Sequence, residues 1–421
     1  MMTDFSSHSL KPLARRTILR GAALAAAGLA ATRHVGAANT ATVTLPFANG
    51  VREVLPAGSF PEKGEMILQR MRAPLLESPW SALANSVFTP NDQFYVRWHF
   101  ADFPNHVEVD PRKFRLRIFG EVQQPIEISL SDLVQHFPAV EIAAVNQCSG
   151  NSRGFVTPRV PGAQWGHGAM GNALWAGVPL RSLLAKAGPK PGATHVAFRS
   201  LEDRESPFPP PLHFEKVLAL PHANDGEVMI AYAMNGDTLP LLNGFPLRLI
   251  VPGWYATYWV KMLSEIEVTN HPGAGFWMAT AYKVPDRPNG AMQPGEANVP
   301  MVPIAAMTPR SFFANPDNGA RIAAGQASEV RGFAFGGSAA LSEVSISADD
   351  GKTWRPVELG KDFGTYSFRQ WRYRFTPGTP GRHRLMVRAG NARGEQQPLQ
   401  AGWNPGGFMF NPVEQLALVA V

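Results

Sequence analysis

The single cysteine of the chain, Cys148, lies in a segment whose residue types suit chemistry better than packing. Residues 146–153 read NQCSGNSR, so small and polar residues surround the thiol and an arginine follows it. A structural cysteine normally packs among aliphatic side chains, whereas cationic neighbours favour the thiolate form of a cysteine. Thiolates are soft ligands that suit redox-active metals. The segment therefore indicates a metal ligand or a reactive nucleophile.

A cysteine nucleophile needs a base, and the sequence offers His99, His136 and His167 with no feature that selects one of them. A lone cysteine cannot form an intramolecular disulfide. The chain also has no Cys-x-x-Cys-His motif for a covalent haem and too few thiols for an iron–sulfur cluster. These two cofactor classes are excluded for this chain.

The composition of the 421 residues predicts two packed domains and a leader. The chain is 45% hydrophobic and 17% charged, which is enough apolar sequence to form a core. The formal net charge is +6, but the first 39 residues account for +4 of it. The remainder is too small to indicate a nucleic-acid partner.

Residues 1–38 predict a twin-arginine signal peptide. Arg15 and Arg16 precede an apolar run at 21–31, and a small-residue site follows at 35–37. This order is typical of an export signal, and the arginine pair favours export of a folded protein over the alternative, a Sec signal. We therefore expect a periplasmic protein. We expect no membrane span, because the run is shorter than about 20 apolar residues.

Residues 39–283 predict a mixed α+β domain that begins with an irregular, proline-rich arm over residues 40–91. Alternating or continuous apolar residues predict strands, and capping residues predict helices. The strands are expected at 94–100, 113–118 and 246–252, and the helices at 131–137 and 179–188. Ser129 or Ser131 is expected to be the N-cap of the first helix.

Six prolines between residues 284 and 309 indicate a connection between domains. Residues 310–421 then contain only strand and turn signals. Strands are expected at 342–347, 371–375 and 384–389, with a turn at 349–352. Strands at this spacing predict an all-β, immunoglobulin-like sandwich.

Several motifs in the same order resemble the sulfite oxidase family, which includes bacterial sulfite dehydrogenases. The Cys148 segment is followed by WGHGAMGNALWAGVPL at 165–180, and the β-domain carries VSIS and DGKTW at 344–347 and 350–354. Other matching blocks are 94–99, 231–236, 243–253 and 259–261. The resemblance covers most of the chain beyond the proline-rich arm.

The resemblance implies a molybdenum–molybdopterin cofactor with Cys148 as the protein ligand to the metal. It further implies a set of cofactor-binding residues, namely Phe94, Tyr95, Arg97, His99, Cys148, Asn243, Arg248 and Lys261. The residues that it places at the substrate are Arg97, His99, Arg153, Trp165 and Tyr282. Arg97 and His99 are two apart on one expected strand, so they face the same side.

The implied activity is oxidation of sulfite to sulfate by oxygen-atom transfer, with electrons passed to a separate c-type cytochrome. A homodimer or a heterodimer with the cytochrome is the implied assembly. Many sulfite-oxidising relatives carry an arginine in the C-terminal tail, whereas residues 403–411 contain none. An enzyme of the same fold that acts on another small sulfur compound or oxyanion, or that reduces a sulfoxide, is therefore an alternative. A pterin-free assembly subunit is the alternative from a different class.

Overall fold

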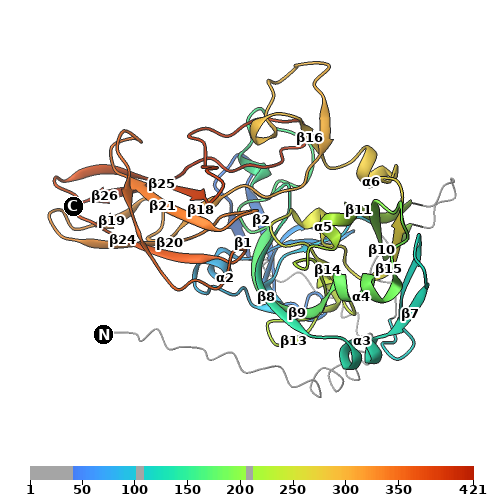
Figure 1. Cartoon of the computed structure of the whole chain (residues 1–421). Coiled ribbons are helices and arrows are strands. Elements are labelled where there is room, and N and C mark those ends of the chain that lie inside the picture. Colours follow the sequence, from blue (N-terminus) through green and yellow to red (C-terminus); the bar gives the residue numbers. More distant parts are fainter. Residues whose placement is uncertain (1–40, 101–108, 205–211) are drawn as a thin grey trace.

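The computed structural model describes residues 41–100, 109–204 and 212–421 (Figure 1). The predicted signal peptide lies outside these residues. A strand-rich body containing β2 to β15 lies on one side, and the C-terminal strands β18 to β26 extend from it as a second part (Figure 1). Within the described ranges, every helix is too short or too polar to span a bilayer.

Residues 42–97 form an antiparallel five-stranded sheet, so the prediction of an irregular arm over 40–91 is wrong. The strands, in spatial order, are β1 (Thr42–Thr44), β2 (Val51–Leu55), β3 (Met66–Arg70), β4 (Leu75–Glu77) and β5 (Val96–Arg97). The prolines of this region lie beside the strands instead of within them. Pro56 follows β2, for example, and Pro74 precedes β4. A proline outside a strand leaves its ladder of hydrogen bonds intact.

Two further sheets build the rest of the first domain. One has the order β11 (Leu212–Ala219), β10 (His195–Arg204), β15 (Leu263–Thr269), β6 (Arg115–Gly120) and β7 (Ile126–Ser129). The other has the order β13 (Asp237–Thr238), β12 (Met229–Met234), β9 (Met170–Pro179) and β8 (Val140–Gln147), with β14 (Arg248–Ile250) also paired to β12. The last five residues of β8 are buried, so Cys148 follows directly from a strand fixed in the core.

Short helices connect these strands. They are α2 (Trp80–Ala84), α3 (Leu130–His136), α4 (Leu180–Ala187), α5 (Leu220–Ala223) and α6 (Phe276–Ala279), and the 3-10 turns are η2 (Asn91–Gln93), η3 (Arg153–Phe155), η4 (Leu241–Asn243), η5 (Ala256–Tyr258) and η6 (Pro288–Gly290). Both predicted helices are confirmed as α3 and α4. The N-cap of α3 is Ser129, whose side chain accepts a hydrogen bond from the Asp132 amide. Gly188 ends α4 with a positive φ of 65°.

The predicted strand over 94–100 is reduced to the two residues of β5. The amides of His99 and Phe100 donate to the carboxylate of Glu202, at 2.5 and 3.3 Å, in place of a neighbouring strand. A buried carboxylate therefore ends the strand. The predicted strand at 246–252 is likewise shortened to β14.

The C-terminal domain is a two-sheet β-sandwich, as predicted. One sheet has the order β18 (Arg310–Asn315), β20 (Ser328–Phe335), β24 (Arg369–Phe375) and β23 (Glu358–Leu359). The other has the order β19 (Ala320–Ile322), β26 (Glu414–Ala420), β25 (Gly381–Asn391), β21 (Leu341–Ser347) and β22 (Arg355–Pro356). Val344 and Ile346 point into the core between the sheets, as the alternation in 342–347 predicts.

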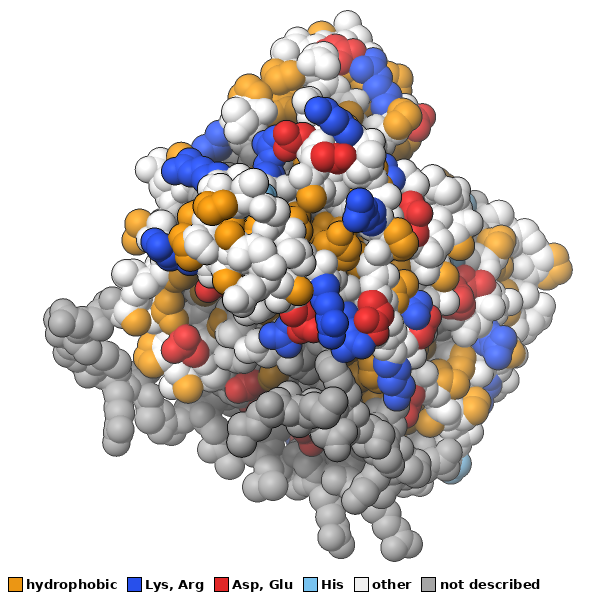
Figure 2. Space-filling model, turned by 90° about the vertical axis from the view of Figure 1, so that its left-hand side faces the viewer, with side chains coloured by type: hydrophobic (Ala, Val, Ile, Leu, Met, Phe, Trp, Pro, Cys, Tyr) orange, Lys and Arg blue, Asp and Glu red, His pale blue; other side chains and the backbone are white. Residues whose placement is uncertain are grey.

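The two domains share a hydrophobic cluster. The connection between them forms a hairpin of β16 (Lys283–Pro285) and β17 (Met301–Pro303). Val284 and Ile304 from this connection pack with Leu83 of α2 and with Phe312 and Phe333 of the sandwich. On the face that Figure 2 presents, acidic and basic side chains are interspersed with hydrophobic ones.

Candidate active site

A cavity opens where the first domain's sheets meet the connection to the sandwich. Its lining residues are Tyr95, Arg97, His99, Cys148, Ser149, Phe214, Leu242, Asn243, Arg248, Ala256, Thr257, Trp259, Lys261 and Tyr282. Eight of the predicted site residues are in this set, although they come from segments nearly 190 residues apart in sequence. The fold therefore brings together most of the predicted site.

Backbone hydrogen bonds fix the loop that carries Cys148. The Cys148 amide donates to the Ala169 oxygen at 2.9 Å, and the Asn151 side chain accepts from the Ala169 amide at 3.0 Å. Glu77 of β4 holds the loop that leads into β9, because its carboxylate accepts hydrogen bonds from the amides of Gly166 and Gly168. Cys148 as a residue is 8% exposed, and its thiol is free in the described part of the chain. This is a rigid position for a ligand.

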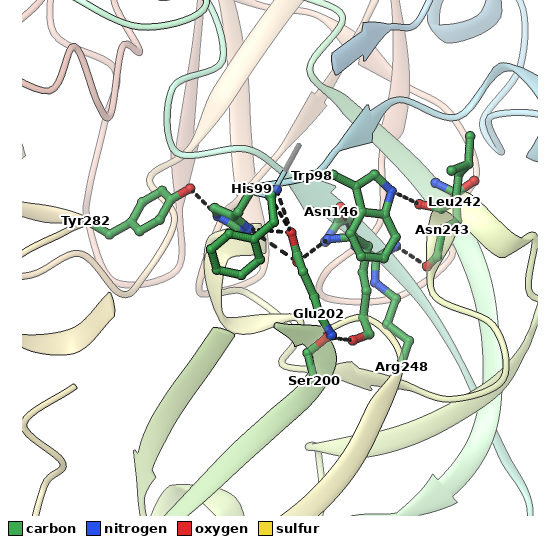
Figure 3. A network of polar contacts seen from close by, with 11 residues as sticks. Trp98, His99, Asn146, Ser200, Glu202, Leu242, Asn243, Arg248 and Tyr282 are labelled. Atoms are coloured by element: carbon green, nitrogen blue, oxygen red, sulfur yellow. Dashed lines mark hydrogen bonds and ion pairs between the residues drawn. The ribbon is translucent and has the colours of Figure 1, made fainter. Parts of the chain in front are cut away.

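A chain of polar contacts runs from Tyr282 through His99 to Glu202 (Figure 3). The Tyr282 hydroxyl lies 2.9 Å from His99 Nε2, and His99 Nδ1 lies 3.4 Å from the Glu202 carboxylate. The acceptor-only carboxylate selects the tautomer with the proton on Nδ1. Nε2 is then an acceptor, and the Tyr282 hydroxyl donates to it.

Burial determines the protonation of this chain of contacts. It lowers the pKa of His99 to about 3, with a further contribution from Arg97, so the imidazole is neutral. Burial also raises the pKa of Tyr282 to about 12, so the phenol keeps its proton. Although burial raises the pKa of Glu202, the hydrogen bonds that His99 donates and the charge of Lys261 outweigh that effect and lower it. Glu202 is therefore an anion with Lys261 Nζ 3.8 Å away.

The opposite wall of the cavity holds a second polar network. Asn146 Oδ1 accepts hydrogen bonds from Tyr95 Oη at 2.7 Å and from Arg248 Nη2 at 3.2 Å. The Asn243 side chain donates to the backbone oxygen of Tyr95 at 3.1 Å and accepts from Lys63 Nζ at 2.5 Å. Figure 3 shows Asn146, Asn243 and Arg248 close together beside Trp98. Cationic and amide donors thus gather on this side.

Several buried donors around the cavity have no hydrogen-bond partner among the described residues. They are Arg97 Nη1, Asn146 Nδ2, Ser149 Oγ and Arg248 Nε. An unsatisfied buried donor costs about 1–3 kcal/mol, so a group of them indicates a polar ligand that belongs there. A molybdopterin phosphate and its pterin heteroatoms are hydrogen-bond acceptors, and the Cys148 thiolate is a soft ligand for molybdenum. The residues present fit this cofactor.

Three predicted site residues are buried but do not line the cavity. Phe94 packs beneath Tyr95 with ring centroids 5.6 Å apart. Trp165 is 1% exposed within the core. Arg153 donates to the backbone oxygens of Ala163 and Gly406 at 3.0 and 2.8 Å. Arg153 therefore joins the Cys148 loop to the C-terminal tail.

The candidate bases for a cysteine nucleophile are separated by the fold. His136 is exposed at the end of α3. His167 is partly buried between the domains, where its Nδ1 contacts Ser152 Oγ at 2.8 Å and Arg310 Nη2 at 3.3 Å. His99 is the one of the three in the cavity lining, and its ring nitrogens face Tyr282 and Glu202.

Sequence reasoning missed Glu202 and Lys63, which hold the predicted residues in place. Both are buried charges, and each touches residues more than 25 positions away. Phe214, which stacks on His99 with centroids 4.2 Å apart, was also missed. Lys63 and Glu202 lie outside the matched motifs. What marks them as unusual is that charged side chains are rarely buried, and their burial is visible only in the structure.

Known proteins share this architecture. Residues 102–277 match the family model described as oxidoreductase molybdopterin binding domain, and residues 302–418 match the Mo-co oxidoreductase dimerisation domain. The sulfite oxidase of Arabidopsis thaliana is 31% identical over 307 residues, which cover 68% of this chain and 75% of that protein. The chain belongs to the sulfite oxidase family.

A second relative and a solved structure are also similar to this chain. Mouse mitochondrial sulfite oxidase is 32% identical over 292 residues, which cover 67% of this chain and 51% of the mouse protein, so the chain spans about half the length of that relative. The structure of sulfane dehydrogenase SoxCD from Paracoccus pantotrophus has a TM-score of 0.70 at 22% identity, over 86% of this chain and 87% of that chain. These matches confirm the predicted family, fold class and molybdenum–molybdopterin cofactor.

Proposed function

We propose that this chain oxidises sulfite to sulfate and passes the electrons to a separate c-type cytochrome. The observation that carries the proposal is that Cys148, Arg97, His99 and Tyr282 line one cavity. When bound, the molybdenum–molybdopterin group supplies oxygen-atom transfer and takes up the electrons released. The chain has no motif for a covalent haem and too few cysteines for an iron–sulfur cluster, which supports a separate carrier for the electrons.

The side chains of the cavity have separate tasks in this proposal. Arg97 presents an unpaired, buried Nη1 that binds an oxygen of the small anion. Tyr282, whose proton is directed to His99 Nε2, presents the lone pairs of its oxygen to a substrate hydroxyl or a water. The neutral imidazole orients the phenol and does not store a proton, because its pKa is about 3. Asn243, Arg248 and Lys261 hold the cofactor in this proposal.

The test is sulfite-dependent reduction of ferricytochrome c by purified protein whose molybdenum content is known. Rapid, sulfite-specific turnover with stoichiometric molybdenum supports the proposal. Full molybdenum occupancy without turnover, and without a sulfite-induced change in the spectrum of the metal, contradicts it.

A second candidate is oxidation of another small sulfur compound or oxyanion, or reduction of a sulfoxide, at the same site. It is favoured by the tail, where Phe408 stacks on Tyr282 with centroids 5.8 Å apart and no arginine occurs in 403–411. An aromatic tail residue at this position accommodates a less polar substrate better than a dianion. Turnover with a methyl sulfoxide, and none with sulfite, would establish this candidate.

Export and assembly are part of the same proposal. The arginine pair at residues 15 and 16 supports twin-arginine export of the loaded protein to the periplasm. The match of residues 302–418 to a dimerisation domain supports a homodimer, or a heterodimer with the cytochrome. Light scattering of the purified protein with and without cytochrome distinguishes these assemblies, and a monomer under both conditions would contradict both.

A further inference from the structure

Lys216 is a buried amine that the site described above does not use. It lies on β11, is 0% exposed, and forms no ion pair within the described part of the chain. Its Nζ donates one hydrogen bond, to the backbone oxygen of Trp277 at 2.6 Å. Burying an ammonium without a carboxylate partner is unfavourable, which makes an inert, purely packing role a poor explanation for a lysine here.

The geometry connects Lys216 with the cavity. Phe214, two residues earlier on the same face of β11, lines the cavity. Lys216 Nζ lies 5.4 Å from the ring centroid of Tyr282 and 4.6 Å from that of Tyr258. Tyr282 lines the cavity and Lys216 does not, so the amine contacts this wall from outside.

The groups around Lys216 titrate far from neutral pH. Burial lowers the pKa of Lys216 itself to about 7. Burial raises the pKa of both Tyr258 of η5 and Tyr282 to about 12 and lowers that of His99 to about 3. The contact from α6 is the uncharged carbonyl of Trp277, and Arg97, 5.7 Å from the Tyr282 ring centroid, carries a fixed charge.

Two other buried lysines beside the cavity titrate near neutrality. Burial lowers the pKa of Lys63, which donates to the Asn243 side chain, to about 7. Burial lowers the pKa of Lys261, which is paired with Glu202, to about 8. Both lysines are unchanged in the Lys216 variants, so a difference between those variants reports on Lys216.

We propose that Lys216 is a positioning residue that adds positive charge behind Tyr282 and so strengthens the binding of a small oxyanion in the cavity. The C-terminal tail brings Phe408, not an arginine, to the Tyr282 ring, and Lys216 provides the additional cation from β11 instead. The inference rests on the proposed function, because it requires an anionic ligand.

The experiment measures sulfate binding to the molybdenum-loaded enzyme by titration calorimetry between about pH 6 and pH 9. Sulfate is the probe because it stays a dianion over this range, whereas sulfite exchanges a proton within it. Lys216→Gln keeps an N–H donor for the Trp277 oxygen but carries no charge, and Lys216→Arg carries a fixed charge. These two variants separate the charge from the hydrogen bond.

We expect the wild-type Kd for sulfate to rise roughly tenfold as the Lys216 amine loses its proton. A positive charge one side chain away from a bound anion, in a partly buried site, changes the affinity by about this factor. Lys216→Arg should keep tight binding at high pH, and Lys216→Gln should bind weakly throughout. The inference would be overturned if the Kd for sulfate had the same pH dependence in all three proteins. It would also be overturned if the wild type bound no sulfate at any pH.

Sulfite turnover measured on the same samples separates the two claims. Sulfate binding that depends on residue 216 without sulfite turnover supports this inference and contradicts the proposed function. Sulfite turnover with a sulfate affinity independent of residue 216 overturns this inference alone.

Discussion

At the residue scale, the cavity is marked by a buried hydrogen-bond donor that has no acceptor among the described residues. Arg97 Nη1 is buried without a partner among the described residues, although the same side chain lies 5.7 Å from the Tyr282 ring centroid. A guanidinium held in this way is prepared for an oxyanion before the ligand arrives, so little reorganisation opposes binding. The active-site cation is therefore preorganised by its neighbours.

Replacing Arg97 tests that role. Arg97→Met should raise the KM for sulfite by roughly 10- to 100-fold, because one charge-assisted hydrogen bond contributes about 1.5–3 kcal/mol. Steady-state kinetics at fixed pH measure the change. Arg97→Lys, which keeps the charge but not the planar donor fork, should give an intermediate KM. An unchanged KM in Arg97→Met would show that this side chain does not bind the substrate.

Glu202 positions both His99 and Lys261, and its removal should affect the whole site. Glu202→Gln leaves the Lys261 ammonium without its buried partner, and we expect a loss of about 3 kcal/mol in the free energy of unfolding. Molybdenum content should fall as well. The matched control is Glu265→Gln, a partly exposed partner of Arg117, for which we expect a loss below about 1 kcal/mol. Equal stability of the two variants would refute the positioning role.

The site residues recovered from the sequence are those in the recognised motifs, such as Cys148 and Lys261. Glu202 was missed because its role follows from distance in space: it is 103 positions from His99 in the sequence. Arg153 was expected in the cavity, but the oxygens of Ala163 and Gly406 hold its guanidinium outside the lining. A motif predicts that a residue lies near the site, but it does not predict which groups that residue hydrogen-bonds and therefore where its side chain points.

At the element scale, helix α3 shows how local signals decide a boundary. Ser129 Oγ accepts from the Asp132 amide at 3.0 Å, whereas Ser131 Oγ accepts from the Gln135 side chain one turn later. Ser129→Ala should therefore lower the free energy of unfolding by about 1 kcal/mol. Ser131→Ala should change it by less than about 0.5 kcal/mol. Chemical denaturation measures both, and the reverse order would assign the cap to Ser131.

Helix ends were predictable because caps are local, and the early strands were not. The proline-rich region up to residue 91 was expected to be irregular, yet it contains β1 to β4 of a five-stranded sheet. Strands of three to five residues are too short to show an alternating pattern. The contacts that stabilise them, such as Glu77 with Gly166 and Gly168, join distant segments.

At the scale of the whole molecule, His167 lies where the two domains meet. Its ring stacks on Phe155 at 4.5 Å and contacts Phe312 of the sandwich at 5.4 Å. Arg310 always donates, so its contact with Nδ1 makes that nitrogen an acceptor and leaves the proton on Nε2, 3.9 Å from Glu414. A neutral histidine therefore connects the Cys148 loop with the sandwich.

Acid should weaken this arrangement. Burial lowers the pKa of His167 to about 4 and that of His99 to about 3, whereas an unfolded histidine titrates near about 6.5. Between these values the unfolded state binds more protons, so stability falls as the pH falls, by about 1.4 kcal/mol per pH unit for each histidine. Above about pH 6.5 neither histidine contributes a slope.

Urea unfolding of metal-free protein at several pH values between about 7.5 and 5 measures this dependence. His167→Gln keeps an acceptor for Ser152 and Arg310 but does not titrate, so its stability should fall less steeply with acid. The exposed His136→Gln is the control and should leave the slope unchanged. Parallel slopes for wild type and His167→Gln would contradict a His167 that stays neutral in the folded protein.

The central claim is that Cys148 binds the molybdenum of the cofactor. X-ray absorption at the molybdenum edge tests it most directly, on wild type and Cys148→Ser loaded under the same conditions. We expect the variant to show one sulfur scatterer fewer at the metal, with Tyr282→Phe as a control that matches wild type. An identical sulfur shell in Cys148→Ser and wild type would contradict the assignment.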